Sequence, residues 1–235
     1  MKPGHEVAYR SIELQVGRLD APIRVYNKRG IIDTTLRPAG MLLVALGVLL
    51  PLGALLPGQP PDPVHLTMRT SAGVIELEVD SVRAPLSAAN FLRYVDAQLY
   101  AGGTFYRSVR LDNQPDDSVR IEVVQGGMNR ERREEAFPSI PLEGTASTGL
   151  AHRDGVISMA RGAGANTARS AFFICIGDQP ELDEGGSRHQ DGLGFAAFGR
   201  VVRGMDVVRA IQAGATDGQT LVEPVQILEV VRDGR

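Results

Sequence analysis

The chain has 235 residues, of which 43% are hydrophobic, and a formal net charge of −3. This length suffices for one domain with a sizeable core, and the nearly balanced charge argues against a general nucleic-acid-binding surface. Because tryptophan is absent and aromatic residues make up only 5%, the core must be built mainly from aliphatic side chains. The single cysteine, Cys175, excludes an intramolecular disulfide, so cysteine usage does not indicate the compartment.

The N-terminal part contains one long apolar segment. Residues 1–38 show no sustained hydrophobic period, whereas residues 39–56 are apolar, interrupted by Pro51 and preceded by basic residues. This pattern predicts a secretory signal or a membrane anchor, so we expect a periplasmic or otherwise extracytoplasmic protein. No clear signal-peptidase cleavage pattern follows this segment, so a retained membrane anchor remains an alternative to a cleaved signal peptide. The preceding segment is long for a signal peptide, so either translation starts downstream of Met1 or residues 1–38 form a cytoplasmic tail.

The remaining residues, 64–232, are predicted to form the folded domain, joined through a stiff, proline-rich linker at 57–63. Strands are expected at 64–70 and 74–79, separated by a turn at 71–73. A helix is expected to start at Pro85, because Ala88, Phe91, Leu92, Val95 and Leu99 recur at helical spacing. Further strands are expected at 104–109, 121–125, 156–160, 172–176, 195–202 and 225–231, and a second helix at 205–211.

Many short strands with only two isolated helices predict a mainly β protein, a closed antiparallel barrel capped at its ends. The strands do not alternate regularly with helices, which disfavours a Rossmann-type sheet. The glycine-rich segment 161–170 lies between two strands and lacks the helix that a phosphate site needs, so it is a weak nucleotide signal.

Residues 110–120 form a polar, turn-rich connection. Asp112, Asn113, Asp116 and Asp117 within it have the oxygen ligands that calcium prefers. The segment lacks the glycine and the terminal glutamate of an EF-hand loop, so a solvated loop is favoured.

Several motifs occur in an order typical of one family. Residues 104–107 read TFYR, residues 123–127 read VVQGG, and residues 158–174 contain SMA, NT and SAFFI in succession. An F-G-x-V run follows at residues 198–201. In these motifs the chain resembles the cyclophilin family of peptidyl-prolyl cis-trans isomerases over roughly residues 64–232.

The resemblance implies an eight-stranded antiparallel β-barrel capped by two α-helices, and an enzyme that accelerates rotation about X–Pro bonds in unfolded or client polypeptides. It also implies a monomer that needs no cofactor or metal. Uncatalysed X–Pro rotation takes tens to hundreds of seconds. A catalyst therefore needs a dry pocket for the proline ring, a donor aimed at the twisting amide and anchors for the flanking backbone.

The resemblance also assigns site residues. Arg107 stands in the place of the catalytic arginine, and Gln125 is expected to hold the substrate backbone and to orient Arg107. Ala160 and Arg161 would offer backbone groups to the bound peptide. The walls of the proline pocket are expected to be Phe105, Met159, Phe173, Leu182 and Phe195.

The chain departs from the family pattern at several positions near this site. Glu122 stands where a pocket phenylalanine is usual, although the neighbouring long loop makes this register uncertain. Glu181 replaces a tryptophan or phenylalanine, which predicts weak sensitivity to cyclosporin. Phe195 replaces a histidine, Ala171 a glutamine and Arg161 an asparagine. These departures bear on catalytic rate and peptide preference more than on fold.

Two other functions remain to be compared with the isomerase. A cyclophilin-like module that binds proline-containing segments with little turnover would be consistent with Glu122 and Glu181. A hydrolase using Ser158 or Cys175 with His152 or His189 is disfavoured, because no nucleophile elbow or cysteine-protease signature accompanies these residues.

Overall fold

The computed structural model describes residues 26–27, 30–31 and 62–234. The two short N-terminal pieces are strands β1 (Tyr26–Asn27) and β2 (Gly30–Ile31), which pair antiparallel. The predicted signal or anchor at 39–56 lies outside the described residues, as does most of the predicted linker. Within the part of the chain that is described, no helix combines the length and hydrophobicity needed to span a membrane.

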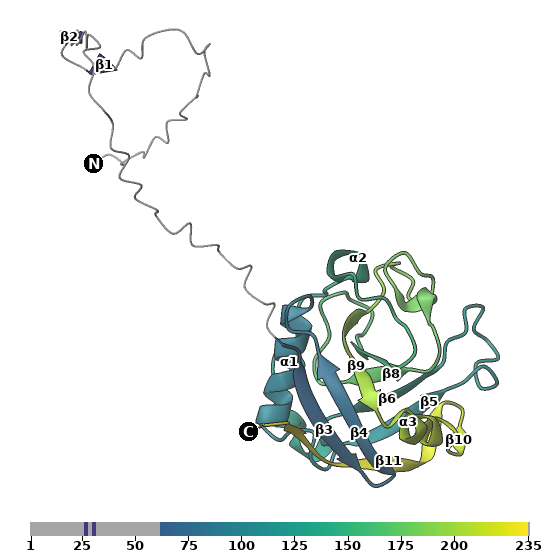
Figure 1. Ribbon diagram of the computed structural model, residues 1–235. Helices are drawn as coiled ribbons and strands as arrows, with labels where there is room; N and C mark the ends of the chain where they lie inside the picture. Colours follow the sequence, from purple (N-terminus) through teal and green to yellow (C-terminus); the bar gives the residue numbers. More distant parts are fainter. Residues whose placement is uncertain (1–25, 28–29, 32–61, 235) are drawn as a thin grey trace, which may run out of the picture. The chain divides into compact units, whose positions relative to one another are not determined.

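Residues from Val64 onward form a closed antiparallel barrel of eight strands, which confirms the predicted fold (Figure 1). The strands follow one another around the barrel in the order β11, β3, β4, β9, β7, β8, β6, β5, and β5 closes the ring by pairing with β11; β10 is an extra strand beside β11. Their bounds are β3 (Val64–Thr70), β4 (Gly73–Val79), β5 (Thr104–Val109), β6 (Val123–Gly127), β7 (Val156–Met159), β8 (Phe172–Cys175), β9 (Ala196–Arg203), β10 (Thr216–Asp217) and β11 (Thr220–Arg232).

Two strands differ from the sequence-based expectation. β6 begins at Val123 rather than at residue 121, because the long polar connection before it extends to residue 122. β11 begins at Thr220 and runs for 13 residues, since it pairs with β5 through its first part and with β3 through its second. Val222, Glu223 and Pro224 are exposed in its first part, so no alternation marked that part as a strand.

The two expected helices are α1 (Pro85–Asp96) and α3 (Met205–Gln212), on different sides of the barrel (Figure 1). A short helix α2 (Thr145–Thr148) and two 3-10 turns, η1 (Arg130–Glu135) and η2 (Pro180–Leu182), lie in the connections. α1 has Pro at its N-terminus and is capped from a distance: the Glu143 carboxylate accepts the N–H groups of Leu86 (2.9 Å) and Ser87 (2.6 Å). A carboxylate on these orphan donors favours the helix start.

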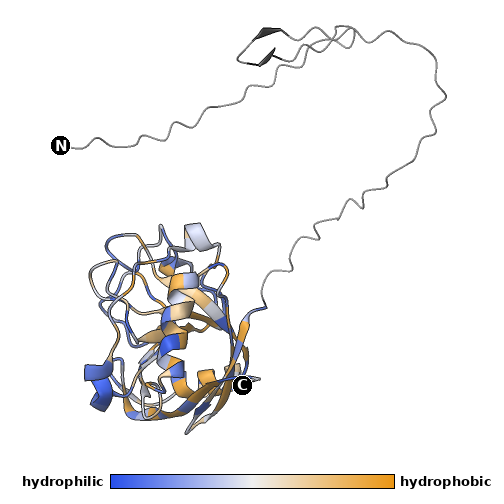
Figure 2. Cartoon of the chain, turned by 90° about the vertical axis from the view of Figure 1, so that its left-hand side faces the viewer, coloured by the Kyte–Doolittle hydropathy of each residue, from blue (hydrophilic) through white to orange (hydrophobic). Residues whose placement is uncertain are grey.

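The barrel interior is aliphatic with one aromatic cluster. Alternate residues of β3 and β4, such as Leu66, Met68, Ile75 and Leu77, are fully buried, and Figure 2 shows hydrophobic residues along the strands. From α1, Phe91 meets three rings: Tyr100, Phe172 and Phe198, at centroid distances of 5.0, 5.6 and 5.1 Å. The few aromatic residues of this tryptophan-free chain are therefore concentrated where α1 packs on the barrel.

A second, smaller hydrophobic cluster lies on the other face of β6 and β8. Strand β8 contributes to both hydrophobic clusters: Phe172 belongs to the barrel core, and its neighbour Phe173 belongs to the second cluster. Side chains of consecutive strand residues point to opposite faces, so β8 supplies both. The second cluster consists of Val109, Ile121, Val123, Phe173, Cys175 and Leu182, with Ala160 and Phe195 packed against it.

Candidate functional site: an arginine at the rim of an apolar pocket

Arg107 of β5 and Gln125 of β6 are direct partners in the strand register. The Arg107 Nη1 donates a hydrogen bond to Oε1 of Gln125 at 2.8 Å, and Nε2 of Gln125 donates to the Tyr106 hydroxyl at 2.8 Å. Two of the predicted site residues are thus joined on the outer face of the barrel.

A β-bulge decides which side of β5 carries the arginine. The register between β5 and β6 shifts between Phe105, which pairs with Gly126, and Arg107, which pairs with Gln125. In a regular strand residues two apart share a face, but one extra residue on one strand reverses that relation. Phe105 therefore points into the barrel while Arg107 points out toward the second cluster.

Beside Arg107 lies a small pocket of about 130 Å³. A water molecule takes up about 30 Å³ in the liquid, so this pocket has room for a few waters or one small ring. Its walls come from β5, β6, the end of β7, β8 and the 180–195 segment, and they are mostly apolar. The lining residues are Arg107, Ile121, Val123, Gln125, Ala160, Arg161, Phe173, Leu182 and Phe195.

The pocket brings together seven of the nine predicted site residues and leaves out Phe105 and Met159. Both are fully buried in the barrel core, where Phe105 packs edge-on against Phe172 at 5.6 Å. The bulge in β5 turns Phe105 inward, and Met159 occupies the inward position of β7. The expectation that these two side chains wall the pocket is corrected accordingly.

Ile121 and Val123 take the pocket positions that the sequence analysis left unassigned. They lie four and two residues before Gln125, on the same face. Glu122 turns away from the pocket: its carboxylate accepts a hydrogen bond from Nε2 of Gln212 in α3 at 3.3 Å. Period-two counting back from Gln125 would have identified both aliphatic residues.

The 110–120 connection is held at its base by a buried amide. The Gln114 Nε2 donates to the carbonyl oxygens of Arg110 (2.7 Å) and Ile121 (2.8 Å), and its Oε1 accepts from the Ile121 N–H (3.2 Å). This amide fixes the backbone of Ile121 and so places an aliphatic side chain in the pocket.

Arg161 anchors the loop opposite Arg107. Its side chain has no exposed surface, and its Nη atoms form two hydrogen bonds to the Asp191 carboxylate, at 2.9 and 2.7 Å. These bonds hold the pKa of Asp191 well below its ordinary value. The guanidinium also lies over the Phe195 ring at 5.3 Å, and that ring meets Phe173 edge-on at 5.4 Å. The arginine therefore fixes one wall of the pocket.

Two further backbone and side-chain contacts bear on the predicted roles. The Ala160 N–H donates to the Ala171 carbonyl at 2.9 Å, so this N–H is already used within the fold. The Glu181 carboxylate accepts from the Ser187 N–H at 2.9 Å, within its own loop. Glu181 is absent from the pocket lining, whereas the adjacent Leu182 forms part of it.

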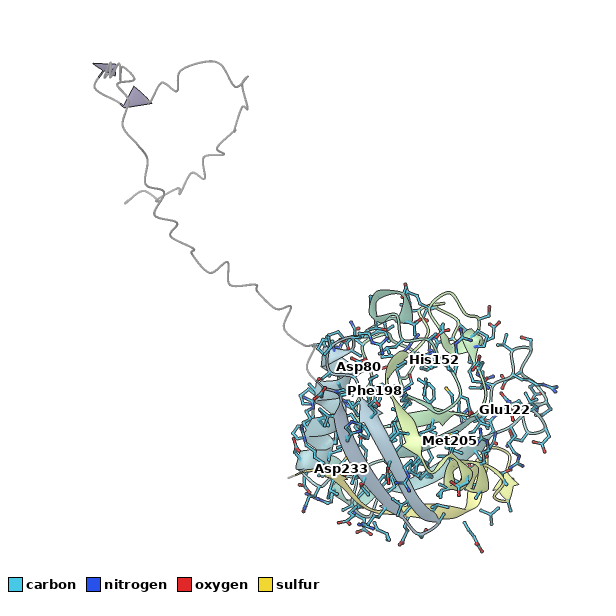
Figure 3. All side chains as sticks on the ribbon, viewed as in Figure 1. Asp80, Glu122, His152, Phe198, Met205 and Asp233 are labelled. Atoms are coloured by element: carbon cyan, nitrogen blue, oxygen red, sulfur yellow. The ribbon has the colours of Figure 1, made fainter. Side chains whose placement is uncertain are left out.

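A buried polar network supports the pocket from behind. His152, labelled in Figure 3, is 1% exposed. Its ring stacks on Phe173 at a centroid distance of 5.8 Å. Its Nδ1 lies 2.7 Å from the Asp183 carboxylate and its Nε2 lies 3.0 Å from the Ser158 hydroxyl. Since a carboxylate only accepts, Nδ1 carries the proton and Nε2 accepts from Ser158. Through His152 the network connects the Phe173 ring to Asp183, which follows the pocket residue Leu182.

This imidazole gives a pH prediction. Burial lowers the pKa of His152 below its ordinary 6.5, although Asp183 opposes the shift. Just below pH 6.5 the unfolded chain therefore binds a proton at His152 more readily than the folded chain does. The contribution of His152 to the free energy of unfolding is fully present above pH 6.5 and is lost as the pH falls below it. We expect His152→Gln to reduce the slope of the free energy of unfolding against pH, to which one histidine contributes at most about 1.4 kcal/mol per pH unit. Urea unfolding of both proteins between pH 5 and 7.5 measures this slope.

The control for this experiment is His65→Gln, because His65 is exposed on β3. An exposed imidazole keeps its water on folding, so this variant should retain the parent's slope. A slope that is the same in the parent and in His152→Gln would contradict the prediction.

The same three residues, serine, histidine and aspartate, do not form a hydrolytic site. Ser158 and Cys175 have no exposed surface, and burial raises the pKa of the Cys175 thiol far above its ordinary range. A nucleophile must reach its substrate, and neither of these side chains can. The burial of Ser158 and Cys175 therefore agrees with the sequence, which already disfavoured a hydrolase.

Comparisons with known proteins agree with this architecture. Residues 65–232 match the family described as cyclophilin type peptidyl-prolyl cis-trans isomerase/CLD. Peptidyl-prolyl cis-trans isomerase A of Dickeya dadantii is 36% identical over 153 residues, 65% of this chain and 73% of the relative. A peptidyl-prolyl cis-trans isomerase of Acinetobacter baylyi is 33% identical over 168 residues, 69% of this chain and 82% of the relative.

Among solved structures, a cyclophilin-type isomerase of Cryptosporidium parvum, crystallised in the presence of the dipeptide Ala-Pro, superimposes with a TM-score of 0.58. The match covers 73% of this chain and 99% of that one at 18% identity, so it bears on the fold alone. The barrel and the family match together define the class: the chain belongs to the cyclophilin-type peptidyl-prolyl cis-trans isomerases. It is an enzyme of protein folding, a rotamase.

Proposed function

We propose that this enzyme turns over X–Pro bonds of unfolded or client polypeptides at the pocket beside Arg107. The observation that carries the proposal is the Arg107–Gln125 pair, joined at 2.8 Å on the rim of an apolar cavity. An apolar cavity for a small ring next to a fixed donor is what rotation about an X–Pro bond needs.

Arg107 is the proposed donor. Rotation breaks amide resonance, and the prolyl nitrogen then becomes pyramidal and can accept a hydrogen bond. A donor that engages this nitrogen only in the twisted state lowers the barrier without tightening the ground state. A reduction of about 7 kcal/mol corresponds to roughly a 10⁵-fold acceleration.

Burial supports this role. Arg107 is half-buried, and removal from water lowers the pKa of its guanidinium, with Arg188 adding to the effect. An arginine nevertheless stays protonated in proteins. A cation held in a partly dry place interacts more strongly with a developing lone pair than one in bulk water.

The neighbouring residues have supporting roles in the proposal. Phe173, Leu182 and Phe195 surround the proline ring, together with Ile121 and Val123. Gln125 orients the guanidinium and meets the substrate backbone. Because the N–H of Ala160 is used by Ala171, the peptide would meet the Ala160 carbonyl.

The binding-module alternative loses its main argument in this geometry. Glu122 and Glu181 favoured it because each replaces a pocket residue, yet Glu122 turns to Gln212 and Glu181 turns to Ser187. Neither carboxylate lines the pocket. A protease-coupled assay on proline tetrapeptides tests the choice: turnover above background by the purified domain supports the enzyme, and tight binding without turnover supports the module.

We further propose that the enzyme works outside the cytoplasm. The support is the apolar segment 39–56 with basic residues before it. N-terminal sequencing of the protein recovered from fractionated bacterial cells tests this and shows whether the segment is removed. Leu50→Arg, a charge within the apolar segment, is the matched control and should retain the protein in the cytoplasm. An unprocessed parent chain in the cytoplasmic fraction would contradict the proposal.

A further inference from the structure

A second amide, far away in the sequence, also holds the Arg107 guanidinium. Oε1 of Gln219 accepts from Nε of Arg107 at 3.0 Å and from Nη2 at 2.5 Å. Gln219 lies in the tight turn between β10 and β11, 112 residues from Arg107 in the sequence. The side chain is half-buried, so the contact is part of the fold around the site.

The backbone makes this contact a fixed feature. Thr220 is the register partner of Arg107, and the Ser108 N–H donates to the Gln219 carbonyl at 2.9 Å. A guanidinium has only donors, so the amide oxygen of Gln219 faces it. The amide nitrogen turns the other way and donates to the Asn113 carbonyl at 3.4 Å. Strand pairing and the 110–120 connection thus set the orientation of the Gln219 amide.

Counting donors shows what this arrangement achieves. A guanidinium carries five N–H groups in a rigid plane. Gln219 takes the Nε–H and one Nη2–H, and Gln125 takes one Nη1–H. One N–H on each terminal nitrogen is left for a substrate. Two acceptors on separate atoms of one plane fix its position and its tilt, whereas Gln125 alone would leave the plane able to swing about one bond.

We propose that Gln219 is a positioning residue for Arg107, which holds the guanidinium plane so that its remaining N–H groups meet the twisting prolyl amide. The inference rests on the proposed role of Arg107. Misplacing a catalytic group by about 1 Å can cost on the order of a hundredfold in rate.

The test compares Gln219→Leu with Gln219→Glu in the proline-tetrapeptide assay. Leucine keeps the bulk and removes the acceptor, so kcat should fall about tenfold with KM within about twofold. Glutamate keeps an acceptor oxygen at the same reach and should recover most of the lost kcat. Gln226→Leu is the matched control, since Gln226 is exposed on β11, the strand that follows Gln219, and it should leave both constants unchanged.

A second measurement does not depend on activity. In the parent, the Nε–H proton of Arg107 is held by Gln219 and should give a protected NMR resonance that disappears in Gln219→Leu while the barrel resonances persist. Unchanged kcat in Gln219→Leu, equal losses in the leucine and glutamate variants, or a change confined to KM would each overturn the inference. These results are distinct from failure of the proposed function, in which Arg107→Ala itself would retain full activity.

Discussion

Arg107→Ala is expected to lower kcat/KM for a proline tetrapeptide by about 10²–10³-fold, the loss typical of removing a preorganised donor from a developing charge. The loss should appear in kcat, because the donor acts on the twisted state rather than on the planar one. The fold should persist, since Arg107 lies on the outer face of the barrel, outside both hydrophobic clusters.

Two further variants make this experiment specific. Arg107→Lys keeps the charge but carries its three donors on one nitrogen and cannot reproduce the planar fork that Gln125 and Gln219 hold, so it should stay at least about tenfold below the parent. Arg200→Ala removes an exposed arginine of β9 that pairs with Glu78 and should be fully active. An active Arg107→Ala would leave a cyclophilin barrel whose turnover depends on other groups.

The largest stability effect is expected at Phe172. Phe172→Ala should lower the free energy of unfolding by about 3–5 kcal/mol, the usual loss for truncating a buried aromatic residue. The ring has no exposed surface and meets Phe91, Tyr100 and Phe105 at centroid distances between 5.5 and 5.6 Å. Urea unfolding at pH 7 measures the change.

Phe173→Leu is the matched comparison, one residue along the same strand and on the opposite face. Replacing the Phe173 ring by another hydrophobic side chain should lower the free energy of unfolding by less than about 1.5 kcal/mol. It should nevertheless reduce kcat/KM, because the ring lines the pocket. The two variants should therefore separate stability from activity. Equal effects of both on stability and on activity would contradict the division of β8 into an inner and an outer face.

The barrel and most of the pocket residues could be predicted from the sequence. The residues that were misplaced or missed have local structural causes. Alternation in β3 and β4 and the helical stripe from Ala88 to Leu99 are strong patterns because each buries one face. Phe105 was assigned to the pocket through the resemblance to cyclophilins, and a place in the core could not be distinguished from the sequence. The bulge between Phe105 and Arg107 turns Phe105 into the barrel, and no pattern in the sequence marks that bulge.

Contacts between distant segments were beyond reach of the sequence. Ile121 has the even spacing from Gln125 that puts both on one face, but the long connection before it obscured its register, and the buried Gln114 amide holds it in place. Gln219 belongs to no motif and reaches Arg107 because β11 pairs with β5. Gln219 therefore joins the site through closure of the barrel, which no local pattern encodes.

That closure has a consequence for synthesis. Strand β11, which ends at Arg232, supplies the second neighbour of both β3 and β5. A growing chain that has not yet reached residue 219 has an open sheet with two unpaired edges, and Arg107 lacks its contact with Gln219. The barrel and the Arg107 site are therefore completed only after strand β11 has left the ribosome, so X–Pro bonds in the strands made earlier rotate uncatalysed or with the help of another isomerase.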